Sequence, residues 1–280
     1  MKDQAMKQPI MIRVAGPEKG LPLITLLARK MSISRNEAKR LIDSRRVFVN
    51  QQRVWMARHE VEGGDRIEVH GTQDRETEAP CPILWQDDYF LIIDKPAGWL
   101  ANGPGSIEER VSRETGKPVH AVHRLDRDTS GCMLLAWRKS DGEKMIPVFQ
   151  RREVQKIYEG LVVGKATAGL EVIDRDVQGE SALTLVKTLR KNGQFSRMEF
   201  TLITGRTHQI RRHLHAVGLH LAGEKNYGAT TVEHPALRTM PRHMLHAKTL
   251  GFPHPFTEKT VQIRAPLPAD YRRAAHDLGV

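Results

Sequence analysis

One segment of the chain joins a group of charged side chains directly to an apolar stretch. Residues 122–131 read Val-His-Arg-Leu-Asp-Arg-Asp-Thr-Ser-Gly, and the apolar residues 132–136 that follow predict a buried strand. Asp126 therefore stands at the entrance to a core strand, where a side chain is held rigidly. A carboxylate there could add to an electrophilic carbon, remove a proton or stabilise a developing positive charge. An aspartate in a turn also commonly caps its own backbone, so the segment alone leaves both roles open.

The order of residues in this segment resembles the signature loop of a family of RNA-modifying enzymes. The string His-Arg-Leu-Asp-x-x-Thr-Ser-Gly at residues 123–131 is similar to that of the RluA class of pseudouridine synthases. A sister class that acts on ribosomal RNA has Gly where His123 stands. Further motifs of the class follow in the family's order, so that the resemblance covers residues 83–265. They are the Lys-Pro-x-Gly turn at 95–98, the Lys-x-Tyr strand at 156–162, the Gly-Arg-x-His-Gln-Ile-Arg segment at 205–211, and the closing segment of His246-Ala247 with residues 252–255.

The resemblance implies an isomerase reaction. Enzymes of this class break the N1 glycosidic bond of a uridine, turn the uracil and rejoin it through carbon. The reaction involves no redox change, so no nicotinamide or flavin cofactor is expected. The resemblance further implies that Asp126 is the catalytic carboxylate, that Tyr158 lies against the target base and that Arg206 pairs with Asp126. Whether Asp126 attacks ribose C1′, adds to C6 of the base or deprotonates C2′ stays open.

The residue types suit these roles. A carboxylate in a dry pocket takes up a proton unless a cation holds it ionised, and the guanidinium fork of Arg206 could clamp it. Arg206 could instead bind phosphate. Tyr158 offers a stacking face worth ~1–3 kcal/mol per base, although tyrosine is also an ordinary strand residue. The target nucleotide must flip out of an RNA helix, and Arg124 is the candidate to fill its place. His123 and Lys156 are expected to contact RNA as well.

The first quarter of the chain predicts a second, smaller domain. Residues 21–27 are apolar at roughly helical spacing, and Ser34 and Glu37 have the spacing of a capping box that opens another helix. Residues 47–49 and 53–55, separated by 50–52, predict a hairpin, and residues 66–69 predict a strand.

This stretch resembles the ribosomal-protein S-four-like (alpha-L) RNA-binding domain. The matches are Ser-Arg-x-x-Ala-x-x-Leu-Ile at 34–42, Val-x-Val-Asn at 47–50 and Gly-Asp-x-Ile-x-Val at 64–69, whereas residues 20–23 depart from the usual start of the first helix. The basic residues around the second helix are expected to bind RNA, although a solvated helix face is the alternative. These residues are Arg35, Lys39, Arg40, Arg45 and Arg46.

Charge and composition agree with a nucleic-acid partner. The chain has 280 residues, with Lys+Arg 44 against Asp+Glu 33, a formal net charge of +11 and a pI of about 9.8. Such a charge attracts polyanions, but it informs partners rather than fold. Two cysteines cannot build a disulfide framework, which suits a reducing compartment. No signal peptide and no apolar run of the ~20 residues needed to cross a membrane is evident, so a soluble, cytoplasmic protein is expected.

These patterns predict an α+β protein in four parts. We expect a lead-in over 1–20, the RNA-binding domain over 21–70, a polar linker over 71–82 and a catalytic domain over 83–280. The catalytic domain is expected to have the pseudouridine synthase fold, a mixed, largely antiparallel sheet flanked by helices, and the front domain to be a small α/β unit. The histidines clustered at 208–220 have neither cysteine nor carboxylate at ligand spacing, so no metal site is predicted.

The expected function is isomerisation of specific uridines in structured RNA by a monomer that does not bind membranes. A front domain of this kind favours large-subunit ribosomal RNA, and transfer RNA is the alternative substrate. A catalytically silent ribosome-assembly factor and a nucleoside glycosylase are the competing functions. Residues 99–103, Trp-Leu-Ala-Asn-Gly, depart from the family's pattern after its Lys-Pro-x-Gly turn, where relatives often place Val and His, and could alter a loop that contacts substrate.

Overall fold

The structure is a computed structural model that describes residues 9–43, 47–54, 56–69, 80–165, 169–228 and 232–280. The chain divides into two compact units, Met1–Ala79 and Pro80–Val280. The division falls within the stretch expected to be the linker, most of which lies outside the described residues. Each unit has its own hydrophobic core and is described by itself.

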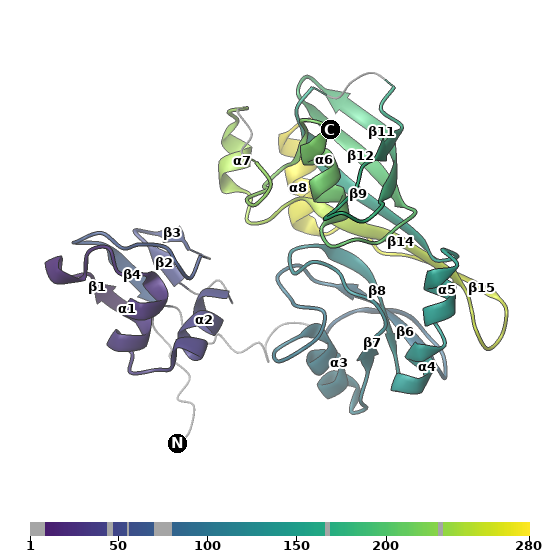
Figure 1. Cartoon of the computed structure of the whole chain (residues 1–280), viewed down its shortest axis with the longest axis horizontal. Coiled ribbons are helices and arrows are strands. Elements are labelled where there is room, and N and C mark those ends of the chain that lie inside the picture. Colours follow the sequence, from purple (N-terminus) through teal and green to yellow (C-terminus); the bar gives the residue numbers. More distant parts are fainter. Residues whose placement is uncertain (1–8, 44–46, 55, 70–79, 166–168, 229–231) are drawn as a thin grey trace. The chain divides into compact units, whose positions relative to one another are not determined.

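The first unit places two helices against a small sheet (Figure 1). Its helices are α1 (Leu23–Lys30) and α2 (Arg35–Asp43), with a 3-10 turn, η1, at Gly16–Glu18. The sheet has the order β1-β4-β2-β3, with bounds Ile10–Arg13, Arg66–Val69, Val47–Val49 and Gln52–Arg53. The predicted capping box is confirmed: the Ser34 amide donates to Glu37 Oε2 at 2.8 Å, and the Glu37 amide donates to Ser34 Oγ at 3.2 Å.

Two expectations for this unit are wrong in detail. Strand β1 lies in the stretch expected to be a lead-in, yet it pairs antiparallel with β4, with Ile12 opposite Ile67. The hairpin turn has two residues rather than three, because Asn50 and Gln51 both adopt positive φ angles (50° and 65°) and Val49 pairs with Gln52. Two consecutive left-handed residues match the twist of a tight hairpin.

The second unit is built on a sheet of eleven strands within the described residues (Figure 1). The main path has the order β10-β11-β12-β9-β14-β8-β6-β5, while β13 pairs with β9, β15 with β14 and β7 with β8. The strands are β5 (Ile83–Gln86), β6 (Phe90–Lys95), β7 (His120–Ala121), β8 (Ser130–Ala136), β9 (Gln155–Val163), β10 (Val172–Asp174), β11 (Leu183–Asn192), β12 (Phe195–Leu202), β13 (His220–Leu221), β14 (Leu245–Pro253) and β15 (Thr260–Arg264). In the described part every pair is antiparallel except β8 with β14, which confirms the predicted mixed, largely antiparallel sheet.

Helices cover both faces of this sheet, which explains why strands β6 and β8 are largely apolar. On β6, Leu91 and Ile93 belong to one buried cluster while Phe90 and Ile92 belong to another, and every residue of β8 is buried. Side chains alternate between the faces of a strand, so a strand covered on both sides needs apolar residues at every position. The helices are α3 (Ile107–Thr115), α4 (Lys139–Glu143), α5 (Ile146–Gln150), α6 (Gln209–Ala216), α7 (Pro235–Thr239) and α8 (Ala269–Asp277).

The junction of β8 with β14 fixes where the charged loop of residues 122–129 ends. Gly131 lies opposite Ala247 in the parallel pair and has a φ of 110°. A Cβ at this position would lie 2.2 Å from the Ala247 carbonyl oxygen. Only glycine fits so close an approach at such an angle, so the end of the loop is fixed against the central strand.

Candidate active site

A cavity in the second unit gathers the motif residues of three segments. Its wall combines the loop before β8, strand β9 and the start of helix α6. The lining includes Asp126, Tyr158, Arg206, His208, Arg211 and Leu245. The side chain of Asp126 is 18% exposed, so it is partly buried yet open to the cavity. The structure therefore brings together the three residues that the sequence singled out for chemistry, although it does not pair them as expected.

The cation that pairs with Asp126 is Arg211. Its Nη1 donates to Asp126 Oδ2 at 3.2 Å, and its side chain is only 5% exposed. The rest of the guanidinium is held by Glu224: Nε donates to Oε2 and Nη2 donates to Oε1, both at 2.7 Å. A bidentate pair of this kind fixes the plane of the guanidinium. Glu224 therefore holds the Arg211 guanidinium in place while its Nη1 contacts Asp126.

Glu224 also sets the charge balance of the site. Burial opposes ionisation of Glu224, but the hydrogen bonds from Arg211 and from the Asn226 amide outweigh it and lower its pKa to about 2. Glu224 therefore stays ionised and offsets the charge of Arg211. One guanidinium lies between two carboxylates, so Asp126, Arg211 and Glu224 together carry a formal net charge of −1.

The expected pairing of Arg206 with Asp126 is wrong. Arg206 forms an ion pair with Glu180, its Nε donates to the Ser181 carbonyl at 3.2 Å, and its side chain is 38% exposed. The reason is local: Arg206 precedes α6, whereas Arg211 lies inside the helix and is buried. Both arginines of the motif carry the guanidinium that a partly buried carboxylate needs. Only the position at which α6 begins distinguishes them.

Tyr158 stands on β9 with 9% of its surface exposed. Burial, with a further contribution from the nearby Asp126, raises the pKa of its hydroxyl above the usual value. The ring therefore stays neutral near pH 7. A neutral aromatic ring in the wall of this cavity offers a stacking surface to a base without adding charge beside Asp126.

Buried groups hold the loop of residues 122–129 from within the core. Lys95 is fully buried, and its Nζ donates to the carbonyls of Pro96, Arg127 and Thr129 at 2.8–3.0 Å. Burial lowers its pKa to about 7. Sequence reasoning matched Lys95 to the Lys-Pro-x-Gly turn but assigned it no contact, because its acceptors are backbone atoms that carry no sequence signal.

A second support comes from residues just before and within β14. Arg242 Nη1 donates to the Asp128 carbonyl at 3.0 Å, and its Nε and Nη2 pair with Asp270 on α8 at 2.7 and 3.0 Å. His243 Nε2 lies 3.1 Å from Thr129 Oγ1, and His246 Nδ1 lies 2.9 Å from Ser130 Oγ. Arg242 was not singled out from the sequence.

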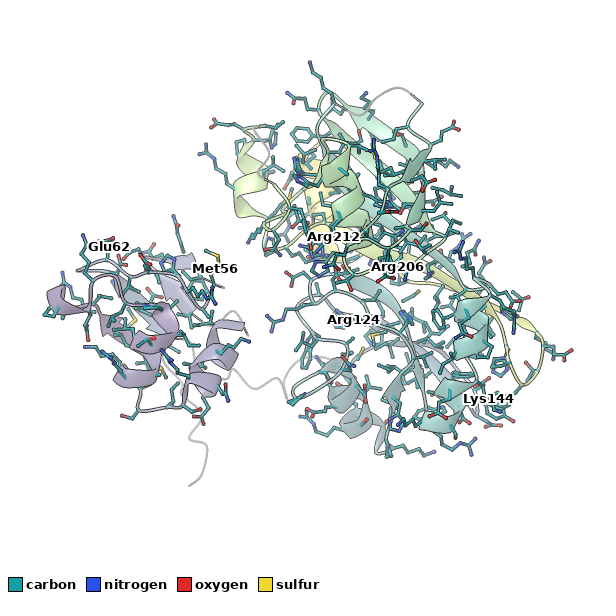
Figure 2. The ribbon with its side chains drawn as sticks, in the orientation of Figure 1. Met56, Glu62, Arg124, Lys144, Arg206 and Arg212 are labelled. Atoms are coloured by element: carbon teal, nitrogen blue, oxygen red, sulfur yellow. The ribbon has the colours of Figure 1, made fainter. Side chains whose placement is uncertain are left out.

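The residues expected to contact RNA near the cavity differ in what they offer. Arg124 is exposed, whereas the Lys156 Nζ lies 3.4 Å from the Thr204 carbonyl and its pKa is lowered by burial. His123 accepts a hydrogen bond from the Leu134 amide at 3.0 Å, and burial lowers its pKa to about 4. It supplies no cation at neutral pH. Figure 2 shows Arg124, Arg206 and Arg212 in the middle of the second unit, with Lys144 beside α4 at one end.

In the first unit, the structure describes only part of the predicted basic group. Arg35 donates to Thr25 Oγ1 at 3.0 Å, and Lys39 is exposed. Arg45, Arg46 and the side chain of Arg40 lie outside the described residues. Among the residues that are described, no three His, Cys, Asp or Glu side chains form a metal-binding group, and no helix is long and apolar enough to cross a membrane.

Comparisons with known proteins match both units. A family described as RNA pseudouridylate synthase matches residues 89–216, and a family described as S4 domain matches residues 21–67. The ribosomal large subunit pseudouridine synthase C of Vibrio cholerae is 30% identical over 278 residues, covering 87% of this chain and 88% of that protein. The ribosomal large subunit pseudouridine synthase D of Pasteurella multocida is 30% identical over 275 residues, covering 85% of each. The solved structure of human RNA pseudouridylate synthase domain containing 4 has the same fold, with a TM-score of 0.62 and 23% identity over 71% of this chain and 93% of that chain.

Proposed function

Because the chain belongs to the RNA pseudouridine synthase family, whose members isomerise uridine to pseudouridine in RNA, we propose that Asp126 is its catalytic carboxylate and that large-subunit ribosomal RNA is its substrate. The observation that carries the first part is the pairing of a partly buried Asp126 with Arg211 in a cavity that Tyr158 also lines. The reaction replaces the bond between the ribose and N1 of the uracil with a bond to C5 of the same uracil, without a change in oxidation state. The side chains of the cavity therefore have to orient the base, hold a reactive carboxylate and exclude water.

Each of the three side chains has a distinct task in this proposal. Asp126 faces the ribose and base of a uridine that has left its stack, a conformation that costs a few kcal/mol. Arg211 pairs with the carboxylate and orients it. Tyr158 lies against the uracil as a neutral ring. The lower cost of extruding a base from a loop than from a helix favours a uridine in a loop or a distorted stem as the target.

The rim of the cavity and the first unit hold the rest of the RNA. Arg124, Lys156 and Arg206 surround the cavity with positive charge and suit the phosphates on either side of the target. In the first unit, Arg35 and Lys39 suit other phosphates of the RNA. A full-length variant with both Arg35 and Lys39 changed to Ala should lower the slope of log affinity against log salt by about 2, because each phosphate contact contributes roughly 0.9.

The substrate class rests on the relatives. The proteins from Vibrio cholerae and Pasteurella multocida are named for the large ribosomal subunit and match this chain across both units. Carbodiimide mapping of pseudouridine in total RNA, from cells with and without the gene, should show a lost site in large-subunit ribosomal RNA that returns with the wild-type gene. A lost site in transfer RNA instead would overturn this assignment.

The role of Asp126 is tested by Asp126→Asn, which keeps the shape of the side chain and removes its charge. We expect pseudouridine formation on a substrate stem-loop to fall by on the order of 10⁴-fold, as for other catalytic groups that act as a unit, while RNA affinity stays within about twofold. Retention of activity by the variant would reject the role. A wild-type protein that binds the RNA without modifying any uridine would identify a silent binding factor, and release of free uracil would identify a glycosylase.

A further inference from the structure

Asp126 has a second neighbour on the side away from Arg211. The His208 Nε2 lies 3.6 Å from Asp126 Oδ1, while Arg211 contacts Oδ2. The other ring nitrogen of His208, Nδ1, is hydrogen-bonded to the hydroxyl of Tyr227. A chain of groups thus runs from the Tyr227 hydroxyl through the imidazole to the carboxylate.

The backbone of His208 is held in an uncommon conformation. Its φ and ψ are 58° and 28°, in the left-handed region, at the position that opens α6. A residue with a Cβ pays for this conformation, and it persists only where the surroundings enforce it, most often at functional sites. Two hydrogen bonds hold the turn here. One joins His208 Nδ1 to the Tyr227 hydroxyl, and in the other the Arg206 amide donates to the Gln209 side chain at 2.9 Å.

The neighbours of the ring determine its charge. Burial lowers the pKa of His208, and Arg211 and Arg212 act in the same direction, while Asp126 and Glu224 oppose them. The groups that act on the ring come from four segments: Asp126 in the loop before β8, Arg211 and Arg212 on α6, Glu224 and Tyr227 after β13, and His243 before β14. The net effect of these groups is a pKa of His208 below its usual value of 6.5, so the ring is neutral near pH 7.

A neutral imidazole carries only one N–H, and the geometry selects which nitrogen has it. A lone pair on Nε2 would face the negative Asp126 carboxylate and be repelled. A proton on Nε2 instead faces the carboxylate favourably, and the Tyr227 hydroxyl then donates to Nδ1. The Tyr227 ring is itself held by two cations, since the guanidinium carbons of Arg211 and Arg212 lie 4.9 and 5.0 Å from its centroid.

We propose that His208 is a positioning residue for Asp126 and that Tyr227 fixes its tautomer, so that a neutral Nε2–H donor orients Asp126 Oδ1 while Arg211 orients Oδ2. The inference rests on the proposed role of Asp126. The 3.6 Å separation is longer than a hydrogen bond, and closing it takes a shift of about 0.6 Å, within the tightening that catalytic contacts undergo when substrate binds. A neutral donor fixes the carboxylate without neutralising it as a second cation would.

The proposal is tested by measuring single-turnover pseudouridine formation and RNA affinity of the full chain. His208→Ala should slow the reaction by about tenfold or more, with RNA affinity within about twofold, because a lost orienting contact affects the chemical step. His208→Gln should recover part of the rate, since its amide can donate from the place of Nε2. His276→Ala is the matched control: its side chain is 91% exposed on α8, and its loss should leave the rate unchanged.

Tyr227→Phe supplies a readout that a packing role would not move. The hydroxyl stabilises the neutral imidazole, so its removal should raise the pKa of His208 and shift the acid limb of the pH–rate profile upward by roughly 0.5–1 pH unit. Wild-type rates in His208→Ala, or equal losses in His208→Ala and His208→Gln with an unshifted profile in Tyr227→Phe, would overturn the proposal. Asp126→Asn is measured alongside: activity in that variant overturns the role of Asp126 itself, whereas an inactive Asp126→Asn beside an unaffected His208→Ala overturns only this inference.

Discussion

Two neighbouring residues on β9, Tyr158 and Glu159, point to opposite faces of the sheet and belong to two very different polar clusters. Glu159 is fully buried and both its oxygens are occupied, one by Arg197 and the other by Lys248 at 2.7 Å. On the face of Tyr158, the carboxylate of Asp126 shares its one arginine with Glu224. A carboxylate with two cations is locked and serves the fold. The carboxylate of Asp126 is held less tightly, because its arginine also binds Glu224, and it lines the cavity, where it can react.

Removing Arg211 should have the largest effect on the free energy of unfolding, because its guanidinium binds both Asp126 and Glu224. Arg211→Met leaves Glu224 buried and Asp126 without a cation, and we expect a loss of about 3–5 kcal/mol in the free energy of unfolding, as for other broken buried ion pairs. Denaturant unfolding measures this loss. Arg206→Met is the matched control: its side chain is 38% exposed, so the change should stay within about 0.5 kcal/mol. Equal effects of the two substitutions would contradict the pairing of Arg211 with both carboxylates.

The ion pair between Arg211 and Glu224 should also make the free energy of unfolding depend on pH. The pKa of Glu224 is about 2 in the folded chain, below its usual value of 4.5. The unfolded state therefore binds the proton first, so the contribution of Glu224 is complete above pH 4.5 and is lost as the pH falls towards 2. The shift corresponds to about 3 kcal/mol. Glu224→Gln should flatten the fall in unfolding free energy over this range, and an unchanged slope would show that another carboxylate is responsible.

The smallest of the three effects is expected on the opposite face. Glu159→Gln removes one carboxylate from Arg197 and Lys248, but Lys248 keeps Glu199 at 3.9 Å. The two basic side chains are 31% and 29% exposed, so water also relieves part of the cost. We expect a loss of about 2 kcal/mol in unfolding free energy, below the usual range for a buried pair. The single-turnover rate should stay within about threefold of wild type at a temperature where both proteins are folded. A rate that falls as steeply as in Asp126→Asn would show that the Glu159 cluster also takes part in the reaction.

Local sequence patterns predicted the elements whose causes are local. The apolar run after Gly131, the capping box of Ser34 and Glu37, and the placement of Asp126 before a buried strand all follow from neighbours in the chain. The cavity wall that joins Asp126 to Tyr158 followed from the family motifs rather than from periodicity. The α+β class was predicted from the mixed order of apolar strands and helical stretches, and the linker over 71–82 from its polar composition.

Features that depend on backbone geometry or on distant partners could not be predicted in this way. Arg211 lies on α6, which starts directly after His208 in a left-handed conformation, and residue types alone do not reveal that start. Strand β1 has too few residues for its alternation to stand out, and it is stabilised by pairing with β4, more than fifty residues away. The acceptors of Lys95 are carbonyl groups, which every residue carries.

The parallel pairing of β8 with β14 has a consequence for how proteins of this architecture can diverge. Parallel strands begin at the same edge of a sheet, so the segment that enters β14 lies beside the segment that enters β8, although more than a hundred residues separate them. Added residues near Asp128 would have to displace Arg242 and His243, which hydrogen-bond to Asp128 and Thr129. The two segments can therefore change in length only where these contacts between them are kept.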